Sequence, residues 1–139
     1  MFAEALVCLA LNVYHEARDQ PFIGQVAVAQ VVMNRVRDDR YPDTVCDVVK
    51  QGPTYSWKQD FPVRHRCQFS WYCDGKSDKT PDQTAWQQAM LIAQGVHTGN
   101  LDDFVEGATH YHATYVLPEW AESKVPVVQI GDHMFYRWD

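Results

Sequence analysis

Glu16 is the first residue in this sequence whose type and position could do chemistry. It falls in the last turn of a helix predicted over residues 3–17, at the edge of the apolar face. The negative end of the helix dipole and partial burial both disfavour an ionised carboxylate there, which predicts a raised pKa. A raised pKa suits a general acid working near neutral pH. The alternative is a solvated glutamate paired with Arg18 or Arg37.

Three histidines form the second candidate site. His110 and His112 lie at positions i and i+2 of a predicted strand, so they share one face of it. Together with His133 they could make a three-histidine zinc site with an open coordination position. The alternative is that they are hydrogen-bonded or exposed strand residues. His15 adjoins Glu16 in sequence but points about 100° away around the helix, which argues against a direct dyad.

The four cysteines leave their chemistry open. Cys8, Cys46, Cys67 and Cys73 permit two disulfides in any of three pairings, and equally permit four free thiols. No C-x-x-C motif is present, so a structural zinc site is not favoured, and no cysteine–histidine motif supports a nucleophile. The sequence also lacks a glycine-rich phosphate loop, a G-x-S-x-G elbow and an H-E-x-x-H helix.

The elements that must position these residues follow a simple order, with helices first and strands last. The second helix is apolar almost all round, which is typical of a buried central helix. Residues 51–79 are predicted to be irregular and are rich in aromatic residues. The pattern indicates an α+β fold. Helices are expected at 3–17, 21–37, about 43–50 and about 81–97, and strands at 109–115, 127–130 and 134–138 with a hairpin turn at 131–133.

Length and charge narrow the function classes. The chain has 139 residues, the size of one domain spanning 1–139, with 46% hydrophobic and 22% charged residues. Its formal net charge is −6 and no cluster of Lys and Arg is evident, which argues against nucleic acid as a partner. The apolar runs are too short for membrane insertion, and residues 1–4 show no signal-peptide pattern. We expect a monomer.

An ordered set of short motifs resembles a known family. Residues 12–37 resemble the opening of the cell-wall hydrolase family of the spore-cortex lytic enzymes SleB and CwlJ, and the likeness continues along nearly the whole chain. The matching segments are Glu16-Ala17-Arg18 with Gln20-Pro21, Gly24-Gln25-Val26-Ala27-Val28-Ala29, Asn34-Arg35-Val36, Gln68-Phe69-Ser70, Gly107-Ala108-Thr109-His110-Tyr111 and Ile130-Gly131-Asp132-His133-Met134-Phe135-Tyr136.

The resemblance implies a peptidoglycan glycosidase with a lysozyme-like fold, mainly helical, with a buried central helix and a small C-terminal antiparallel sheet. The family's catalytic acid maps onto Glu16, and no obvious second carboxylate accompanies it. A single acid fits a lytic transglycosylase that cleaves between N-acetylmuramic acid and N-acetylglucosamine and leaves 1,6-anhydro ends. Asp19 or Asp132 could still serve as a second carboxylate, and the product would then be that of a hydrolytic muramidase.

The motifs also suggest residues that bind substrate. Gln68 and Ser70 could hydrogen-bond the sugar, with Phe69 packing below them; the alternative is that Phe69 is core and Gln68 ties a loop. Tyr111 and His133 could line the cleft opposite the acid. The family implies no metal and no cofactor.

Peptidoglycan places the expected site of action at the bacterial wall, in the periplasm or the spore cortex. Without a signal peptide, a phage endolysin released by another protein is one explanation, and a piece of a longer exported enzyme is another. The 51–79 segment is longer than the family leads us to expect, and could cap the cleft, pinned by a disulfide to Cys46. Two other classes remain open: a zinc amidase or peptidase using the three histidines, and a non-catalytic wall-binding module.

Overall fold

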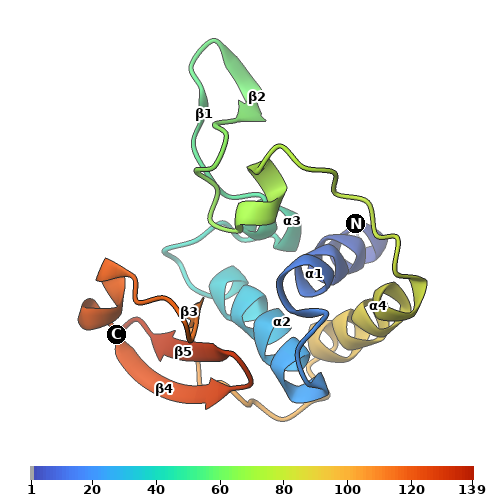
Figure 1. Ribbon diagram of the computed structural model, residues 1–139, viewed down its shortest axis with the longest axis vertical. Coiled ribbons are helices and arrows are strands. Elements are labelled where there is room, and N and C mark those ends of the chain that lie inside the picture. Colours follow the sequence, from blue (N-terminus) through green and yellow to red (C-terminus); the bar gives the residue numbers. More distant parts are fainter. Residues whose placement is uncertain (1) are drawn as a thin grey trace.

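The computed structural model describes residues 2–139 and shows a helical body with a small sheet against one side (Figure 1). The helices agree with the sequence prediction to within three residues at each end. They are α1 (Phe2–Ala17), α2 (Phe22–Val36), α3 (Val45–Val49) and α4 (Gln83–His97). None of these helices is both long and apolar enough to span a membrane.

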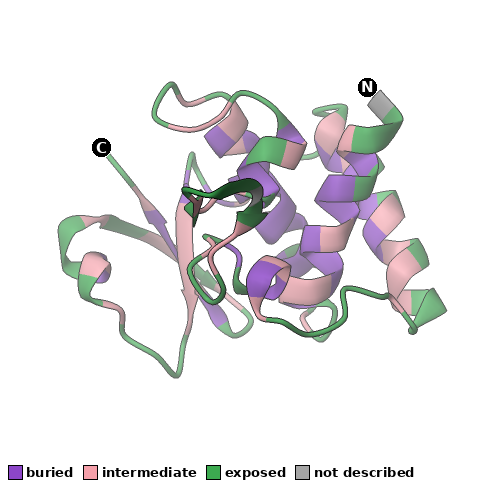
Figure 2. Ribbon diagram, turned by 90° about the horizontal axis from the view of Figure 1, so that it is seen from above, coloured by how far each residue is buried: buried purple, intermediate pink, exposed green. Residues whose placement is uncertain are grey.

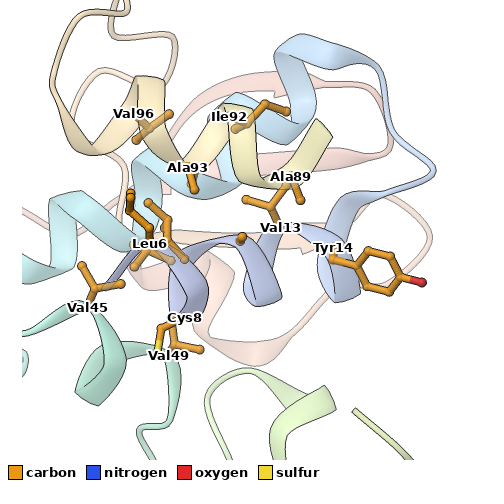
Figure 3. Close-up of a cluster of buried hydrophobic side chains, with 14 of the residues drawn as sticks. Leu6, Cys8, Val13, Tyr14, Val45, Val49, Ala89, Ile92, Ala93 and Val96 are labelled. Atoms are coloured by element: carbon orange, nitrogen blue, oxygen red, sulfur yellow. The ribbon is translucent and has the colours of Figure 1, made fainter. Parts of the chain in front are cut away.

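Helix α1 is in the middle of the main core and contacts each of the other three helices. The residues predicted to share its inner face, Leu6, Ala10, Val13 and Ala17, are all buried. Figure 3 shows side chains of α1, α3 and α4 meeting there, with Tyr14 at the edge of the cluster. This packing fixes the direction in which the last turn of α1 presents its side chains.

Helix α2 is the buried central helix that the sequence predicts, with every residue from Gly24 to Met33 buried (Figure 2). Three polar side chains on α2 donate to backbone carbonyls of one distant segment. Gln30 reaches Asp102 at 2.6 Å, Asn34 reaches Ala108 at 2.9 Å, and Arg35 reaches Thr109 at 2.7 Å. These bonds satisfy polar groups in an otherwise apolar interface and hold the segment that leads into the sheet.

The C-terminal sheet is antiparallel and has the order β3–β5–β4, built from β3 (His110–Ala113), β4 (Val125–Ile130) and β5 (His133–Arg137). Directly paired residues in such a sheet lie on the same face. Tyr111 pairs with Phe135, and Phe135 packs in a second core cluster with residues of α2. This face is therefore turned toward the helices. A short helix, η2 (Glu119–Ser123), which the sequence did not reveal, precedes β4.

Residues 51–79 are less irregular than expected. They contain a hairpin of β1 (Thr54–Tyr55) and β2 (Lys58–Pro62), which projects from the body in Figure 1, and a short helix η1 (Ser70–Cys73). The hairpin was hard to predict because Trp57 and Phe61 point mostly to solvent, so no alternation of buried and exposed residues marks it.

Two disulfides cross-link the chain. Neither is the disulfide between the 51–79 segment and Cys46 that the sequence suggested. The long-range disulfide joins Cys8 on α1 to Cys46 on α3, and the short-range disulfide joins Cys67 to Cys73 across η1. The expected link to Cys46 is wrong because α3 packs on α1, which brings Cys46 within 5.2 Å of Cys8 between Cα atoms.

Candidate active site

Glu16 contacts the sheet directly. It lies in the last turn of α1, and its Oε1 accepts a hydrogen bond of 2.5 Å from the hydroxyl of Tyr111 on β3. The partner is 95 residues away in sequence, and the ion pairs suggested with Arg18 or Arg37 are absent from the described residues. The inward face of the sheet thus supplies the hydrogen bond that orients the carboxyl group.

Burial raises the pKa of Glu16, as the sequence predicts. The Tyr111 hydrogen bond and the positive charge of Arg35 lower the same pKa, and their effect is smaller than that of burial. Burial and the nearby Glu16 raise the pKa of Tyr111 well above its usual value of 10.0, so the phenol remains a hydrogen-bond donor. A glutamate in these surroundings can hold a proton at a higher pH than an exposed one.

Arg35 is a buried cation behind this pair, and it was noted in the sequence only as part of a motif. Its Nε donates to Thr109, and its guanidinium lies 4.9 Å from the ring centre of Tyr41 and 5.2 Å from that of Phe69. Burial lowers the pKa of Arg35 from its ordinary value, while the neighbouring tyrosines and Glu16 oppose this. Its charge is available to stabilise a carboxylate at Glu16.

Asn12 is a site residue that the sequence reading missed. It lies one turn before Glu16 on α1, is fully buried, and accepts a hydrogen bond of 2.9 Å from the indole nitrogen of Trp71. Its amide also lowers the pKa of the Tyr111 phenol. The available signal was a buried-face asparagine in an apolar helix, four residues before the candidate acid.

Two adjoining hollows open along the end of α1, and together they form the cleft of this site. The smaller hollow has a volume of about 230 Å³ and is lined by His15, Glu16, Arg18 and Asp19. The larger hollow has a volume of about 520 Å³; it shares His15 and Arg18 and extends over Trp71. Glu16 therefore lines the smaller hollow, and the larger hollow beside it gives room for an extended ligand.

The other predicted binding residues divide into two groups. His133 lies on the same face as Tyr111, its ring 5.0 Å from the Tyr111 ring, and burial lowers its pKa. Phe69 is buried in the main core, as its alternative interpretation held. Gln68 and Ser70 are exposed and line neither hollow, so their contact with a sugar stays a prediction.

The two possible second carboxylates are placed differently. Asp19 lines the smaller hollow together with Glu16. Asp132 is tied to Gln20, whose side chain donates to the carboxylate at 3.2 Å and accepts from the Asp132 backbone amide at 2.8 Å. Asp19 is thus the carboxylate whose position beside Glu16 merits a test.

The three-histidine zinc site is wrong. His110 and His112 pair with Tyr136 and Met134, whereas His133 pairs with Ala113, so the third histidine lies on the opposite face of the sheet. His112 donates from Nδ1 to its neighbouring carbonyl and accepts at Nε2 from Tyr136. Within residues 2–139, no group of three or more His, Cys, Asp or Glu side chains could hold a metal ion.

Comparisons with known proteins show which sequences and structures this chain is similar to. The sequence model of the Cell Wall Hydrolase family matches residues 19–136, a span that begins just after Glu16. A spore cortex-lytic enzyme of Halalkalibacterium halodurans is 34% identical over 128 residues, which are 91% of this chain and 33% of that protein. One of Bacillus cereus is 30% identical over 130 residues, 93% of this chain and 42% of that protein. The chain thus spans only a third to two fifths of these relatives.

Solved structures extend the likeness to the fold. The catalytic domain of the Bacillus cereus SleB protein aligns with a TM-score of 0.69 and 26% identity, covering 97% of this chain and 91% of that one. The catalytic domain of the germination-specific lytic transglycosylase SleB from Bacillus anthracis aligns with a TM-score of 0.65 and 30% identity, covering 96% and 93%. The α+β, lysozyme-like fold expected from the sequence is confirmed.

Proposed function

The chain belongs to the cell wall hydrolase family, and we propose that it cleaves peptidoglycan glycan strands with Glu16 as the general acid and base. The bond broken is the one between N-acetylmuramic acid and N-acetylglucosamine. The observation that carries the proposal is a partly buried glutamate, hydrogen-bonded to Tyr111, that lines a cleft at the end of α1.

The first step is protonation of the glycosidic oxygen. Burial raises the pKa of Glu16 and so favours its protonated form, and the proton passes to the leaving oxygen as the bond to the muramyl anomeric carbon breaks. The anomeric carbon becomes oxocarbenium-like, and the 2-acetamido group of the sugar can stabilise it. The new Glu16 carboxylate keeps the Tyr111 hydrogen bond and the nearby positive charge of Arg35. These two contacts favour the charged state that the step creates.

The second step uses the same carboxylate as a base. It removes the proton from the muramyl 6-hydroxyl while that oxygen bonds to the anomeric carbon. The product is a 1,6-anhydromuramic end, and Glu16 regains its proton. This lytic transglycosylase route needs one carboxyl group. Similarity to the lytic transglycosylase SleB from Bacillus anthracis supports this route.

A hydrolytic muramidase is the second candidate, because Asp19 lines the same hollow as Glu16. In that route water replaces the 6-hydroxyl, and a second carboxylate activates the water or stabilises the sugar cation. The products then carry ordinary reducing ends.

Digestion of purified peptidoglycan, followed by mass spectrometry of the products, tests both routes. We expect Glu16→Gln to lose about 10²- to 10⁴-fold in rate, the usual contribution of a general acid. Asp19→Asn should stay active and yield anhydro ends. Glu122→Gln, an exposed glutamate on η2, is the matched control and should behave like the wild type.

Each other outcome has a definite meaning. Full activity in Glu16→Gln would overturn the role of Glu16. Reducing ends together with an inactive Asp19→Asn variant would select the muramidase. Binding to wall material without cleavage by the wild type would leave a wall-binding module.

The proposed site of action is the bacterial wall. The curated relatives are named spore cortex-lytic enzymes. All four cysteines are disulfide-bonded, which suits an oxidising compartment outside the cytoplasm. The two explanations given above, a phage endolysin and a piece of a longer exported enzyme, stay predictions.

A further inference from the structure

The larger hollow concentrates positive charge on an acidic protein. The chain carries a net charge of −6, yet Arg18, Lys76 and Lys79 line this hollow against one carboxylate, Asp74. In the part of the chain that the structure describes, none of the three cations takes part in an ion pair. Their charge is therefore open to a ligand in the hollow.

Local contacts hold the Arg18 side chain and shape the loop that carries the two lysines. The Arg18 guanidinium donates to the carbonyl of Tyr14 at 3.2 Å and lies 4.8 Å from the centre of the Tyr14 ring. The loop that carries the lysines is shaped by Asp74, whose Oδ1 accepts from the Lys76 backbone amide at 2.9 Å. The next residue, Gly75, has a φ of +80°, where a side chain would be strained. The position of the Arg18 charge and the backbone of the loop that carries the lysines are thus preformed.

The floor of the hollow is aromatic. Trp71 and Tyr14 are both buried there, and the His15 ring stacks on Trp71 with 4.6 Å between ring centres and 21° between planes. His15 Nε2 donates to the carbonyl of Asp78 at 3.1 Å, which ties α1 to the segment between η1 and α4 (Figure 1). The volume of about 520 Å³ is within the range of ligand-binding pockets.

We infer that the larger hollow binds the peptide branch of the substrate through the carboxylates of that branch. The inference rests on the proposed function, in which the sugar beside Glu16 is a muramyl residue, the sugar that carries the peptide. The hollow adjoins the Glu16 hollow through His15 and Arg18, so a branch from that sugar can reach it. Neutral sugars have no group that calls for three cations, whereas carboxylates pair with them, and the aromatic floor suits alanine methyl groups.

The test compares two substrates and two variants. The substrates are peptide-bearing glycan strands and the same strands after an amidase has removed the peptides, which leaves one lactyl carboxylate on each muramyl residue and takes away the carboxylates and methyl groups of the branch. The test variant is Lys76→Glu/Lys79→Glu. The control is Lys50→Glu/Lys58→Glu, which changes the net charge equally at exposed lysines outside both hollows. We measure kcat/KM for each protein on each substrate, and the Kd of each in the Glu16→Gln background.

We expect the wild type to prefer peptide-bearing strands and the test variant to lose about tenfold of that preference, which corresponds to about 1.4 kcal/mol. The control should keep the wild-type preference. An equal loss on both substrates, or a wild type without preference, would overturn the inference. Failure of the proposed function looks different, because the wild type would then cleave neither substrate. The Kd comparison would still show whether the hollow discriminates peptides.

Discussion

Tyr111→Phe is the sharpest test of how the site controls Glu16. The substitution removes one hydroxyl, the donor of the 2.5 Å hydrogen bond to Glu16 Oε1. It keeps the aromatic ring, which packs 5.5 Å from Phe135 and 5.0 Å from His133 between ring centres. The fold of the sheet should therefore survive, and only the environment of the carboxyl group should change.

The size of the effect follows from the bond that is lost. A hydrogen bond to a charged group contributes about 1.5–3 kcal/mol, and here it favours the Glu16 carboxylate over the protonated acid. Without it the protonated form is favoured further, so the pKa of Glu16 rises. Because 1.36 kcal/mol corresponds to one pH unit, we expect the alkaline limb of the kcat/KM profile to move up by about one to two units.

The assay is the initial rate of release of soluble fragments from purified peptidoglycan, measured across pH for the wild type and Tyr111→Phe. Tyr136→Phe is the matched control. It removes a hydroxyl from the same sheet on the opposite face, where the group contacts His112 at 2.7 Å. Its profile should match that of the wild type.

Two results would refute the reasoning. An alkaline limb that stays in place or moves down would show that the phenol does not stabilise the carboxylate. A loss of rate at all pH values as large as that of Glu16→Gln would show that Tyr111 itself transfers the proton.

Three further predictions concern stability and the loop beside the cleft. Burial raises the pKa of Glu16 above its ordinary value of 4.5. At pH values between 4.5 and the raised pKa, the folded state therefore binds more protons than the unfolded state. The unfolding free energy of the wild type should thus fall across that window as pH rises, and Glu16→Gln should abolish this component in denaturant titrations. Replacing both cysteines of the long-range disulfide by serine should cost about 4 kcal/mol, and of the short-range disulfide about 2 kcal/mol, from the loops they close. The rate of peptidoglycan cleavage should fall more in the variant without the short-range disulfide than in the variant without the long-range one, because the short-range disulfide closes the loop carrying Trp71. Equal cleavage rates would contradict this. Phe135→Ala should lower the unfolding free energy by about 3–5 kcal/mol, because the side chain is fully buried. Denaturant unfolding curves measure this loss, and a clearly smaller value would contradict the prediction.

Local patterns in the sequence predicted most of the elements. The apolar period of α1 and the near-continuous apolar surface of α2 depend on residues close together in the chain, so they could be read directly. The same patterns placed Glu16 at a helix end and predicted the direction of its pKa shift. The ordered motifs predicted the fold that the solved structures confirm.

Contacts between distant segments could not be read in this way. The suggested disulfide to Cys46 depended on how α3 packs on α1, and the hydrogen bond between Trp71 and Asn12 joins η1 to α1. The cationic hollow likewise assembles from the end of α1 and the 71–81 segment. Each of these contacts needs the packing of two elements to be known.

The sequence by itself determined where the candidate acid stands in its helix, and the tertiary structure decided which groups surround it. The strand register shows why. Because side chains alternate between faces, pairing Ala113 with His133 puts that histidine beside Tyr111 and away from His112. A shift of one residue would exchange the two faces, place the histidines together and remove the phenol from Glu16. That choice is made by burying Phe135 against α2, a contact between residues that are far apart in the chain.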